Sequence, residues 1–196
     1  MTQHSADSAL QGMPVWIGLG SNSPDAPQRL EAALAGLAAM DGLAIAKVSP
    51  VYRTEPQDYA DQPFFYNQVL EARADARWHP VALMRALLEL EASLGRRRSP
   101  DPALRFGPRA IDIDMLLCGE GGALASDDPV CLLPHPRLVR RAFWLVPLRD
   151  IAPHLAIQGE SVGTHLARLA WTMEDNIIFQ EQPGAAGSLI PGESND

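Results

Sequence analysis

The sequence predicts an α+β fold of the ferredoxin-like kind, a β-α-β-β-α-β sandwich with a mainly antiparallel sheet and C-terminal additions. Two observations support this prediction. Strand-like runs and helix-like segments follow one another in that order, and no internal repeat or linker divides the chain. The length of 196 residues and the hydrophobic content of 46% suffice for one domain with its own core. We therefore expect one domain over residues 13–172.

The first strand and the first helix follow each other closely. The run VWIGLG at residues 15–20 is apolar and ends at glycines, which indicates a strand. Ser23 is a suitable N-cap and Pro24 suits the first helical position, so a helix is predicted to begin there. Three leucines mark the face that this helix buries: Leu30, Leu34 and Leu37.

Further strands and a second helix complete the central order. A second strand is predicted over residues 43–53, where Pro50 requires a bulge or an edge position. After the loop TEPQDYADQP, residues 64–73 are typical of a third strand. A helix is predicted over residues 79–95, opened by a proline and closed by Gly95. The fourth strand carries the run IDIDML, and we expect both helices on one face of the sheet.

The ends of the chain differ in composition from its centre. Residues 1–12 and 181–196 are rich in small and polar residues. We expect disordered tails over residues 1–12 and 173–196. Between the fourth strand and the second tail, a short strand near residues 130–133 and helical pieces after Pro136 extend the frame.

Composition argues against several classes of protein. The net charge of −8 disfavours a general surface for nucleic acid or anionic membranes. No apolar run reaches the roughly 18–20 residues of a membrane span. The polar N-terminus also lacks the pattern of a signal peptide, so we expect a cytoplasmic enzyme. Cys118 and Cys131 have no CxxC spacing, which favours buried thiols over a zinc site.

Arginine is concentrated in one segment of this acidic chain. Fifteen of the 16 basic residues are arginines, and five of them lie between Arg96 and Arg109, where Asp101 is the one acidic residue. Guanidinium groups make forked contacts to phosphate, so the cluster is a candidate anion site. A solvated basic loop is the plain alternative. The prolines and the serine of the segment also suit a mobile lid over residues 96–105.

Two aspartates follow inside an apolar strand. Side chains two apart in a strand share a face, so Asp112 and Asp114 point to one side, and Ile111, Ile113 and Met115 point to the other. Two like charges on a half-buried face repel each other and lose solvation unless a partner compensates them. Magnesium ions, which prefer carboxylate oxygens and accompany nucleotide phosphates, would do so. A solvated strand edge explains the pair alone about equally well.

The arginines and the carboxylates together indicate phosphoryl transfer, which relies on positioning and charge stabilisation. Other enzyme classes find less support. The segment GLGSNS at 18–23 lacks the third glycine of a dinucleotide motif and the GK[ST] of a Walker A loop, so we interpret it as a strand-to-helix turn. The absence of HExxH spacing and of a GxSxG elbow disfavours zinc enzymes and serine hydrolases.

Six spaced motifs carry a resemblance to a known family. They are IGLGSN (17–22), YRTEP (52–56), DQPFFYN (61–67), GRRR (95–98), RFGPRAIDIDML (105–116) and PHPRLVRRAFWLVPL (134–148). With these motifs in order, the chain from about Val15 to about Pro153 resembles the 6-hydroxymethyl-7,8-dihydropterin pyrophosphokinases of folate biosynthesis. The resemblance implies a ferredoxin-like fold and ATP as co-substrate. It also implies transfer of the β,γ-diphosphate of ATP to the pterin hydroxymethyl group, which leaves AMP.

The resemblance implies roles for residues on the phosphate side of the site. Asp112 and Asp114 would hold two Mg²⁺ ions between the triphosphate and the pterin. Four arginines would act on the phosphates, the first two as clamps and the other two from the mobile loop: Arg96, Arg109, Arg98 and Arg105. Contacts to ATP are implied for three further residues: Glu91, His135 and Arg141.

The resemblance also implies roles on the pterin side. Asn67 would read the amide edge of the ring, while Phe65 and Phe143 would sandwich its plane and add aromatic contacts to the buried area. Plain core packing is the alternative for both phenylalanines. Thr54 and Phe106 belong to the same implied set, and Phe106 stands where a tryptophan is usual.

One departure and two rival functions complete the sequence evidence. Leu88 stands where the family commonly has a glutamine that contacts the nucleotide, which bears on rate and affinity. A binding domain that grips RNA or nucleotide through its arginines has no use for paired carboxylates. A metal-dependent sugar transferase does not explain Asn67 and the aromatic set. The resemblance implies ATP and the pterin as partners, without nucleic acid, membrane or an obligate protein partner, and we expect a monomer.

Overall fold

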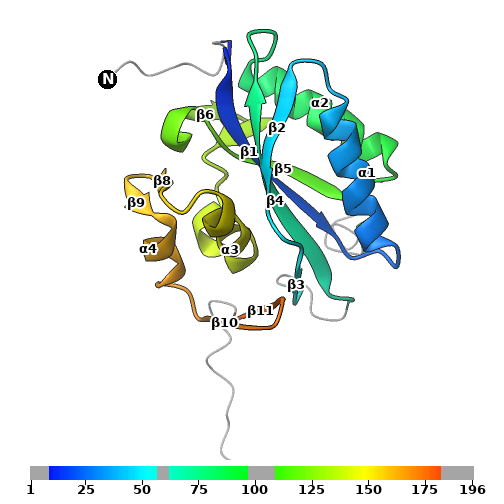
Figure 1. Ribbon diagram of the computed structural model, residues 1–196, viewed down its shortest axis with the longest axis vertical. Coiled ribbons are helices and arrows are strands. Elements are labelled where there is room, and N and C mark those ends of the chain that lie inside the picture. The colour runs from blue at the N-terminus through cyan, green and yellow to red at the C-terminus, as the bar shows by residue number, and fades with distance from the viewer. Residues whose placement is uncertain (1–8, 57–61, 97–108, 182–196) are drawn as a thin grey trace, which may run out of the picture.

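The computed structural model describes residues 9–56, 62–96 and 109–181, and one twisted sheet runs through this part of the molecule (Figure 1). The order of its strands is β10-β11-β3-β4-β1-β5, and β2 also pairs with β4. Among these pairs β11 and β3 are parallel, and the others are antiparallel. The strands are β1 (Met13–Ser21), β2 (Leu43–Val48), β3 (Tyr52–Thr54), β4 (Phe65–Ala74), β5 (Asp112–Cys118), β10 (Trp171–Glu174) and β11 (Ile177–Gln180).

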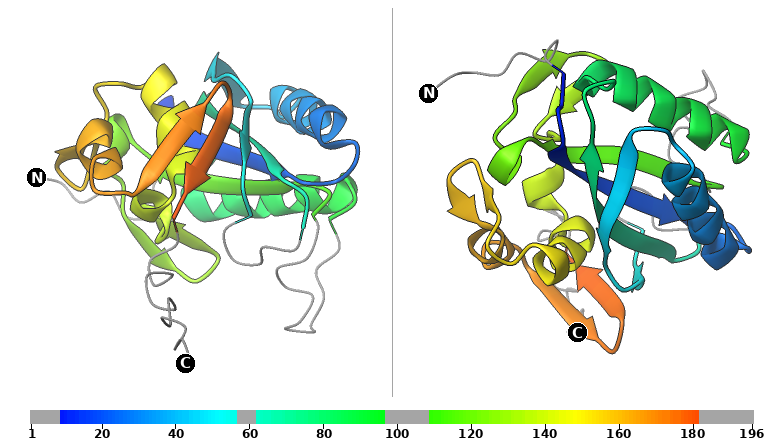
Figure 2. Two further views of the ribbon diagram at one scale, coloured as in Figure 1. Left: turned by 90° about the horizontal axis from the view of Figure 1, so that it is seen from below. Right: turned by 45° about the horizontal axis from the view of Figure 1, so that its top comes forward.

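Helices cover both faces of this sheet (Figures 1 and 2). The helices α1 and α2 pack on one face, whereas α3 packs on the other face with α4 beside it. The described helices are α1 (Ala26–Ala38), α2 (Pro80–Ser93), α3 (Ala142–Ile151) and α4 (Val162–Leu166), with the 3-10 turns η2 (Glu120–Gly122) and η3 (Leu138–Arg140). Two small ladders complete the fold: β6 (Ser126–Asp128) with β7 (Cys131–Leu133), and β8 (Ala156–Ile157) with β9 (Glu160–Ser161).

The predicted α+β fold is confirmed. The central order β1-α1-β2-β3-β4-α2-β5 follows the ferredoxin-like pattern, with α1 and α2 on one face as predicted. The additions after β5 include α3, which covers the opposite face and gives the sheet a second hydrophobic core. The short strand expected near 130–133 is β7.

The central strand β1 aligns residues from both of its neighbours. Most of its residues are buried, because it lies between β4 and β5 and under helices on both faces. Gly20 lies opposite Asn67 of β4 on one side and opposite Asp112 of β5 on the other. Gly18 lies opposite Asp114. The register of three adjacent strands therefore brings the two aspartates and Asn67 to one end of the sheet.

Two predicted element boundaries differ from the structure. The first helix begins at Ala26 rather than at Pro24, because the Ser23 hydroxyl contacts the Ser21 hydroxyl at 3.0 Å and gives no cap to the helix. The predicted second strand is divided into β2 and β3 by residues 49–51. At this break the Ser49 hydroxyl accepts a hydrogen bond from the Val69 N–H at 3.0 Å, before the proline that cannot donate one.

The predicted tails are wrong over part of their length. Leu10 is fully buried, and its N–H donates to the Trp78 carbonyl at 2.8 Å, so the chain packs on the core before residue 13. At the other end, residues 171–180 form the hairpin of β10 and β11, and Ile178 is almost fully buried. Apolar residues within this segment form the strand that pairs with β3. The prediction missed this strand because it rested on the polar composition of the C-terminus as a whole. Residues 1–8 and 182–196 lie outside the described residues.

Candidate active site

A cleft opens at the C-terminal end of β1, between β3, β4, β5 and the start of α3. Its volume is about 570 Å³, part of it open to solvent. Eight of the residues singled out in the sequence line this one cleft: Thr54, Phe65, Asn67, Arg109, Asp112, Asp114, Arg141 and Phe143.

The two aspartates point into the cleft as the period of two predicts. Asp112 and Asp114 are partly exposed, whereas Ile111, Ile113 and Met115 are at most 2% exposed. The strand therefore places both carboxylates on the cleft face and the apolar side chains in the core. This arrangement puts two sets of hard oxygen donors, of the kind that Mg²⁺ prefers, side by side.

Two arginines neutralise Asp112 in the absence of ligand. The Arg96 Nε lies 3.1 Å from Asp112 Oδ1, and Arg109 Nη1 donates to Asp112 Oδ2. The backbone of Arg109 is itself held by the segment after β1, because its N–H donates to Asn22 Oδ1 at 2.7 Å. The Ser21 hydroxyl adds a bond to the Ala110 carbonyl at 2.6 Å. The polar end of the IGLGSN motif thus anchors the approach to β5.

Asp114 has a less polar environment than Asp112. Burial raises the pKa of Asp114 to about 7, and the charges of Asp112 and Glu91 raise it further against the opposite effect of Arg141 and Arg109. The carboxyl group is therefore part protonated near neutral pH when the cleft holds no cation.

Asn67 lies at the opposite wall from the carboxylates. It is 4% exposed, and its Nδ2 donates to the Thr54 hydroxyl at 2.7 Å. This bond fixes the amide plane and leaves one N–H and the Oδ1 acceptor for a further partner. Phe65 and Phe143 line the same cleft from β4 and α3.

The two glycines of GLGSNS, Gly18 and Gly20, lie in a strand beside side chains that line the cleft, and not in a turn. Both lie inside β1, so the interpretation of this segment as a strand-to-helix turn is wrong for them. A Cβ on Gly20 would come within 2.9 Å of Asn67 Oδ1, and a Cβ on Gly18 would come within 2.9 Å of Trp144 Nε1. Side chains larger than hydrogen at these positions would displace groups that line the cleft.

A second, more open cleft adjoins the first. Asp114 lies in the walls of both clefts, and the second also contains His135 and Leu88. The His135 ring meets the Trp144 ring edge-on, with the ring centroids 4.6 Å apart. The Arg141 guanidinium also lies over the Trp144 ring, 4.5 Å from its centroid. His135 and Arg141 therefore lie near Asp114, and their implied contacts with ATP stay a prediction.

His135 is held in its neutral form. Burial, and after it the positive charges of Arg141 and Arg137, lower its pKa to about 4. Its Nδ1 accepts a hydrogen bond from the Arg137 N–H at 3.1 Å, which leaves the proton of the neutral ring on Nε2.

We expect His135 to make the protein less stable in mild acid. Its folded pKa lies below the ordinary 6.5, so the unfolded chain takes up the proton first as the pH falls. The stability is complete above about pH 6.5 and is lost as the pH falls from there through 4. Between pH 7.5 and pH 5 the loss should be roughly 1–2 kcal/mol, allowing for partial exposure. Asp114 acts in the opposite direction over the same pH range, because its pKa is raised to about 7. The loss due to His135 is therefore the difference in pH dependence between wild type and His135→Gln, measured by urea unfolding at both pH values, and an equal pH dependence in the two proteins would contradict the assignment.

Glu91 has a structural contact that sequence reasoning missed. It is 2% exposed, and its Oε1 accepts a hydrogen bond from the Ile113 N–H at 3.1 Å. The carboxylate therefore ties α2 to the strand that carries the aspartates. Its implied contact with ATP stays a prediction.

Three further residues received no role of their own from the sequence. Ser21 and Asn22, which belong to the IGLGSN motif, bind backbone groups of Ala110 and Arg109 with their side chains, and Gln180 lies in the segment predicted as a tail. Three predicted site residues, Arg98, Arg105 and Phe106, and most of the predicted lid lie outside the described residues.

In the described part of the chain, no group of three or more His, Cys, Asp or Glu side chains is arranged to hold a metal ion. Nor does any helix in that part have the length and apolarity that crossing a membrane requires.

The sequence is similar to one family of known proteins. Residues 16–153 match the family described as 7,8-dihydro-6-hydroxymethylpterin-pyrophosphokinase. The 2-amino-4-hydroxy-6-hydroxymethyldihydropteridine pyrophosphokinase of Methylorubrum extorquens is 42% identical over 154 residues, which cover 79% of this chain and 92% of that protein. The protein of the same name from Pseudomonas aeruginosa is 38% identical over 155 residues, which cover 79% of this chain and 88% of that protein.

Solved structures share the fold. A crystal structure of an HPPK-DHPS in complex with substrates superposes with a TM-score of 0.57 and 12% identity, over 80% of this chain and 43% of that chain. A Plasmodium falciparum HPPK-DHPS with pterin and p-hydroxybenzoate gives a TM-score of 0.60 and 13% identity, over 81% and 43% of the two chains. At this identity the likeness concerns the fold, and this chain spans less than half of those longer proteins.

Proposed function

Because this chain belongs to the 7,8-dihydro-6-hydroxymethylpterin-pyrophosphokinase family, we propose that its reaction takes place in the cleft beside Asp112 and Asp114. The protein is an ATP-dependent diphosphotransferase of folate biosynthesis. It transfers the β,γ-diphosphate of ATP to the hydroxymethyl oxygen of 6-hydroxymethyl-7,8-dihydropterin. A bond forms between that oxygen and the β-phosphorus, the bond from the β-phosphorus to the bridging oxygen of AMP breaks, and the hydroxyl group loses its proton.

One observation supports this location above all others. A single cleft is lined by a buried amide, two phenylalanines, a carboxylate pair and arginines. The amide and the phenylalanines suit a flat heterocycle with donors and acceptors at its edge. The carboxylates and the arginines suit phosphates and a cation. Family membership excludes the rival functions of a plain binding module and a sugar transferase.

The carboxylate pair fits magnesium that is shared with substrate. Mg²⁺ commonly binds through one or two carboxylates and completes its coordination with water and phosphate oxygens. Asp112 and Asp114 offer this donor set, and burial together with the neighbouring Asp112 charge raises the pKa of Asp114, so a cation at this site would favour its ionised form. We propose that the two residues hold two Mg²⁺ ions. When bound, the ions would supply positive charge where the transferring phosphates gain negative charge.

The arginines would then hold and orient the phosphates. Arg96 and Arg109 already lie at Asp112, within reach of anything that this carboxylate binds. Their forked donors can hold a phosphoryl group in line with the attacking hydroxyl. Arg98 and Arg105 are proposed to add to this clamp from the neighbouring segment.

The walls of the cleft would hold the pterin. Asn67, fixed by Thr54, would donate to and accept from the amide edge of the ring. Phe65 and Phe143 would cover its two faces and exclude water, and Phe106 is proposed to add to this stacking.

The second cleft is the proposed place of the nucleoside. His135 lines this cleft together with Asp114, and Arg141 lies over the Trp144 ring that His135 contacts, so both residues can contact ATP. Leu88 lines the same cleft and would give the nucleoside an apolar contact in place of an amide. The proposed site needs no residue from a second subunit, and we propose a monomeric enzyme.

Formation of AMP tests the proposed function directly. The purified protein should produce AMP and the pterin diphosphate when it is given ATP, Mg²⁺ and 6-hydroxymethyl-7,8-dihydropterin. Reactions that lack the pterin, or that contain a chelator, are the controls and should release little AMP. AMP at the same rate without the pterin would indicate hydrolysis of ATP instead.

A further inference from the structure

The C-terminal hairpin of β10 and β11 connects two walls of the cleft. β11 lies parallel to β3, with Ile178 opposite Thr54, and the Arg53 N–H donates to the Asn176 carbonyl at 2.8 Å. β11 also contacts α3, and the hairpin is seen beside α3 and β3 in Figure 2. Since β3 supplies Thr54 and α3 supplies Phe143, one hairpin touches both walls.

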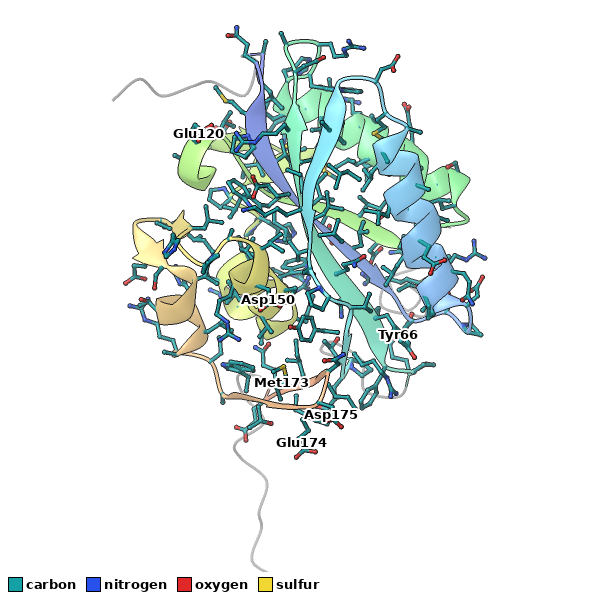
Figure 3. All side chains as sticks on the ribbon, viewed as in Figure 1. Tyr66, Glu120, Asp150, Met173, Glu174 and Asp175 are labelled. Carbon is teal, nitrogen blue, oxygen red and sulfur yellow. The ribbon has the colours of Figure 1, made fainter. Side chains whose placement is uncertain are left out.

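The hairpin reaches the site through the side chain of Gln180. This side chain comes from a residue that is only 7% exposed. Its Nε2 donates to the Arg140 carbonyl at 2.8 Å, and its Oε1 accepts from the Ala142 N–H at 2.7 Å. The amide therefore binds the chain on both sides of Arg141. By contrast, Met173, Glu174 and Asp175 lie at the outer tip of the hairpin (Figure 3).

Gln180 replaces a cap that α3 does not provide for itself. Ala142 is the first residue of α3, and Arg141 in the N-cap position makes no capping bond with its side chain. The first N–H groups of a helix need partners from outside the helix. The Gln180 oxygen supplies one of them from 38 residues further along the chain.

The turn that Gln180 binds carries two residues of the cleft. Arg141 has an extended backbone, with φ −125° and ψ 102°, between the 3-10 turn and α3. Its guanidinium lies 5.2 Å from the Phe143 ring centroid and 4.5 Å from that of Trp144. The direction of Arg141 and Phe143 follows from the backbone of this turn, which the amide holds at two points.

We propose that Gln180 is a positioning residue for diphosphate transfer: its side-chain amide holds the turn from Arg140 to Ala142 so that Arg141 and Phe143 line the cleft. The inference rests on the proposed roles of Arg141 at ATP and Phe143 at the pterin. The hairpin of β10 and β11 lies beyond residue 153, where the match to the family ends, and the proposal gives this hairpin a role in catalysis.

Gln180→Ala tests the proposal against Tyr52→Phe as the matched control. Tyr52→Phe removes the 2.6 Å bond to Asp150 Oδ2, which loosens α3 on β3, and Asp150 lines neither of the two clefts. In Gln180→Ala two backbone groups lose their partner, so we expect the KM values for ATP and the pterin to rise roughly tenfold or more. The value of kcat/KM should fall by roughly ten- to a hundredfold, whereas Tyr52→Phe should keep both KM values within about twofold.

The division between KM and kcat separates positioning from stability. A variant that is merely less stable contains less folded enzyme, which lowers the apparent kcat and leaves KM unchanged. That result in Gln180→Ala would overturn the proposal. If this variant does not fold, Gln180→Glu takes its place, because it keeps the acceptor for Ala142 and loses the donor for Arg140; its KM values should rise, and unchanged values would again overturn the proposal. Wild-type protein that produced no AMP would refute the proposed function instead.

Discussion

Replacing either cleft aspartate by alanine should nearly abolish turnover. For Asp112→Ala and for Asp114→Ala we expect kcat to fall by roughly a hundredfold or more, because the charge that develops on the phosphates would lose its proposed metal ligands. Both residues are partly exposed at the cleft end of β5, so truncation should leave the core intact. AMP formation with saturating substrates measures the loss, and circular dichroism checks the fold.

The exposed Asp127 in β6 provides the control for charge alone. Asp127→Ala should retain full activity, because this residue lines neither of the two clefts. Near-normal turnover of Asp112→Ala or Asp114→Ala at low magnesium would remove the metal assignment.

The stability of the ligand-free protein provides a separate test of Asp114. The pKa of Asp114 is raised from 3.8 to about 7, so the folded state disfavours its ionised form. The protein therefore loses stability from this group as the pH rises from about 4 to 7. Asp114→Asn should be the more stable protein at pH 8 and should show no such gain below pH 4.

Asn67→Ala is expected to weaken binding of the pterin far more than binding of ATP. The variant leaves the edge of a buried ring without its partner, at a cost of roughly 1–3 kcal/mol, so affinity should fall by one to two orders of magnitude. ATP would be held by arginines and magnesium at the other side of the cleft and should be little affected. Calorimetric titration of each ligand distinguishes the two effects.

Gly20→Ala tests the same amide without changing it. The added Cβ would lie 2.9 Å from Asn67 Oδ1 and must displace the amide, so the affinity for the pterin should fall here too. If Asn67→Ala lowered the affinities for the pterin and for ATP equally, together with the melting temperature, Asn67 would have a structural role beside Thr54 instead.

Local patterns in the sequence were sufficient for the central fold. The order of strands and helices, the alternation around Asp112 and Asp114, and the helix α2 between a proline and Gly95 depend on neighbours in sequence. Gly95, with φ +97°, ends this helix in a conformation that glycine adopts without strain. Two of the motifs that carried the family resemblance lie mostly on these elements: IGLGSN in β1 and the IDIDML run in β5.

Contacts between distant residues could not be predicted in this way. Gln180 binds a turn about 40 residues earlier, and Glu91 binds the N–H of Ile113 through a side chain that the sequence marks only as acidic. The glycines of β1 resembled a turn because their actual constraint, the close approach of Asn67 and Trp144, arises from β4 and α3. Such partners become visible only when the strands are in register.

Because Asp112 is paired with Arg96 and Arg109, the ligand-free site should bind metal and nucleotide together more readily than either one alone. Free magnesium would have to displace two guanidinium groups from Asp112, and free phosphate would have to remove those groups and leave the carboxylate without compensation. When metal and nucleotide bind together, Asp112 exchanges its two arginines for the metal, and the arginines exchange Asp112 for phosphate. No charge then remains without a partner. Each ligand should therefore raise the affinity for the other by the same factor. We therefore expect the enzyme to bind inorganic phosphate and free cations weakly, and to bind the magnesium complex of ATP more tightly.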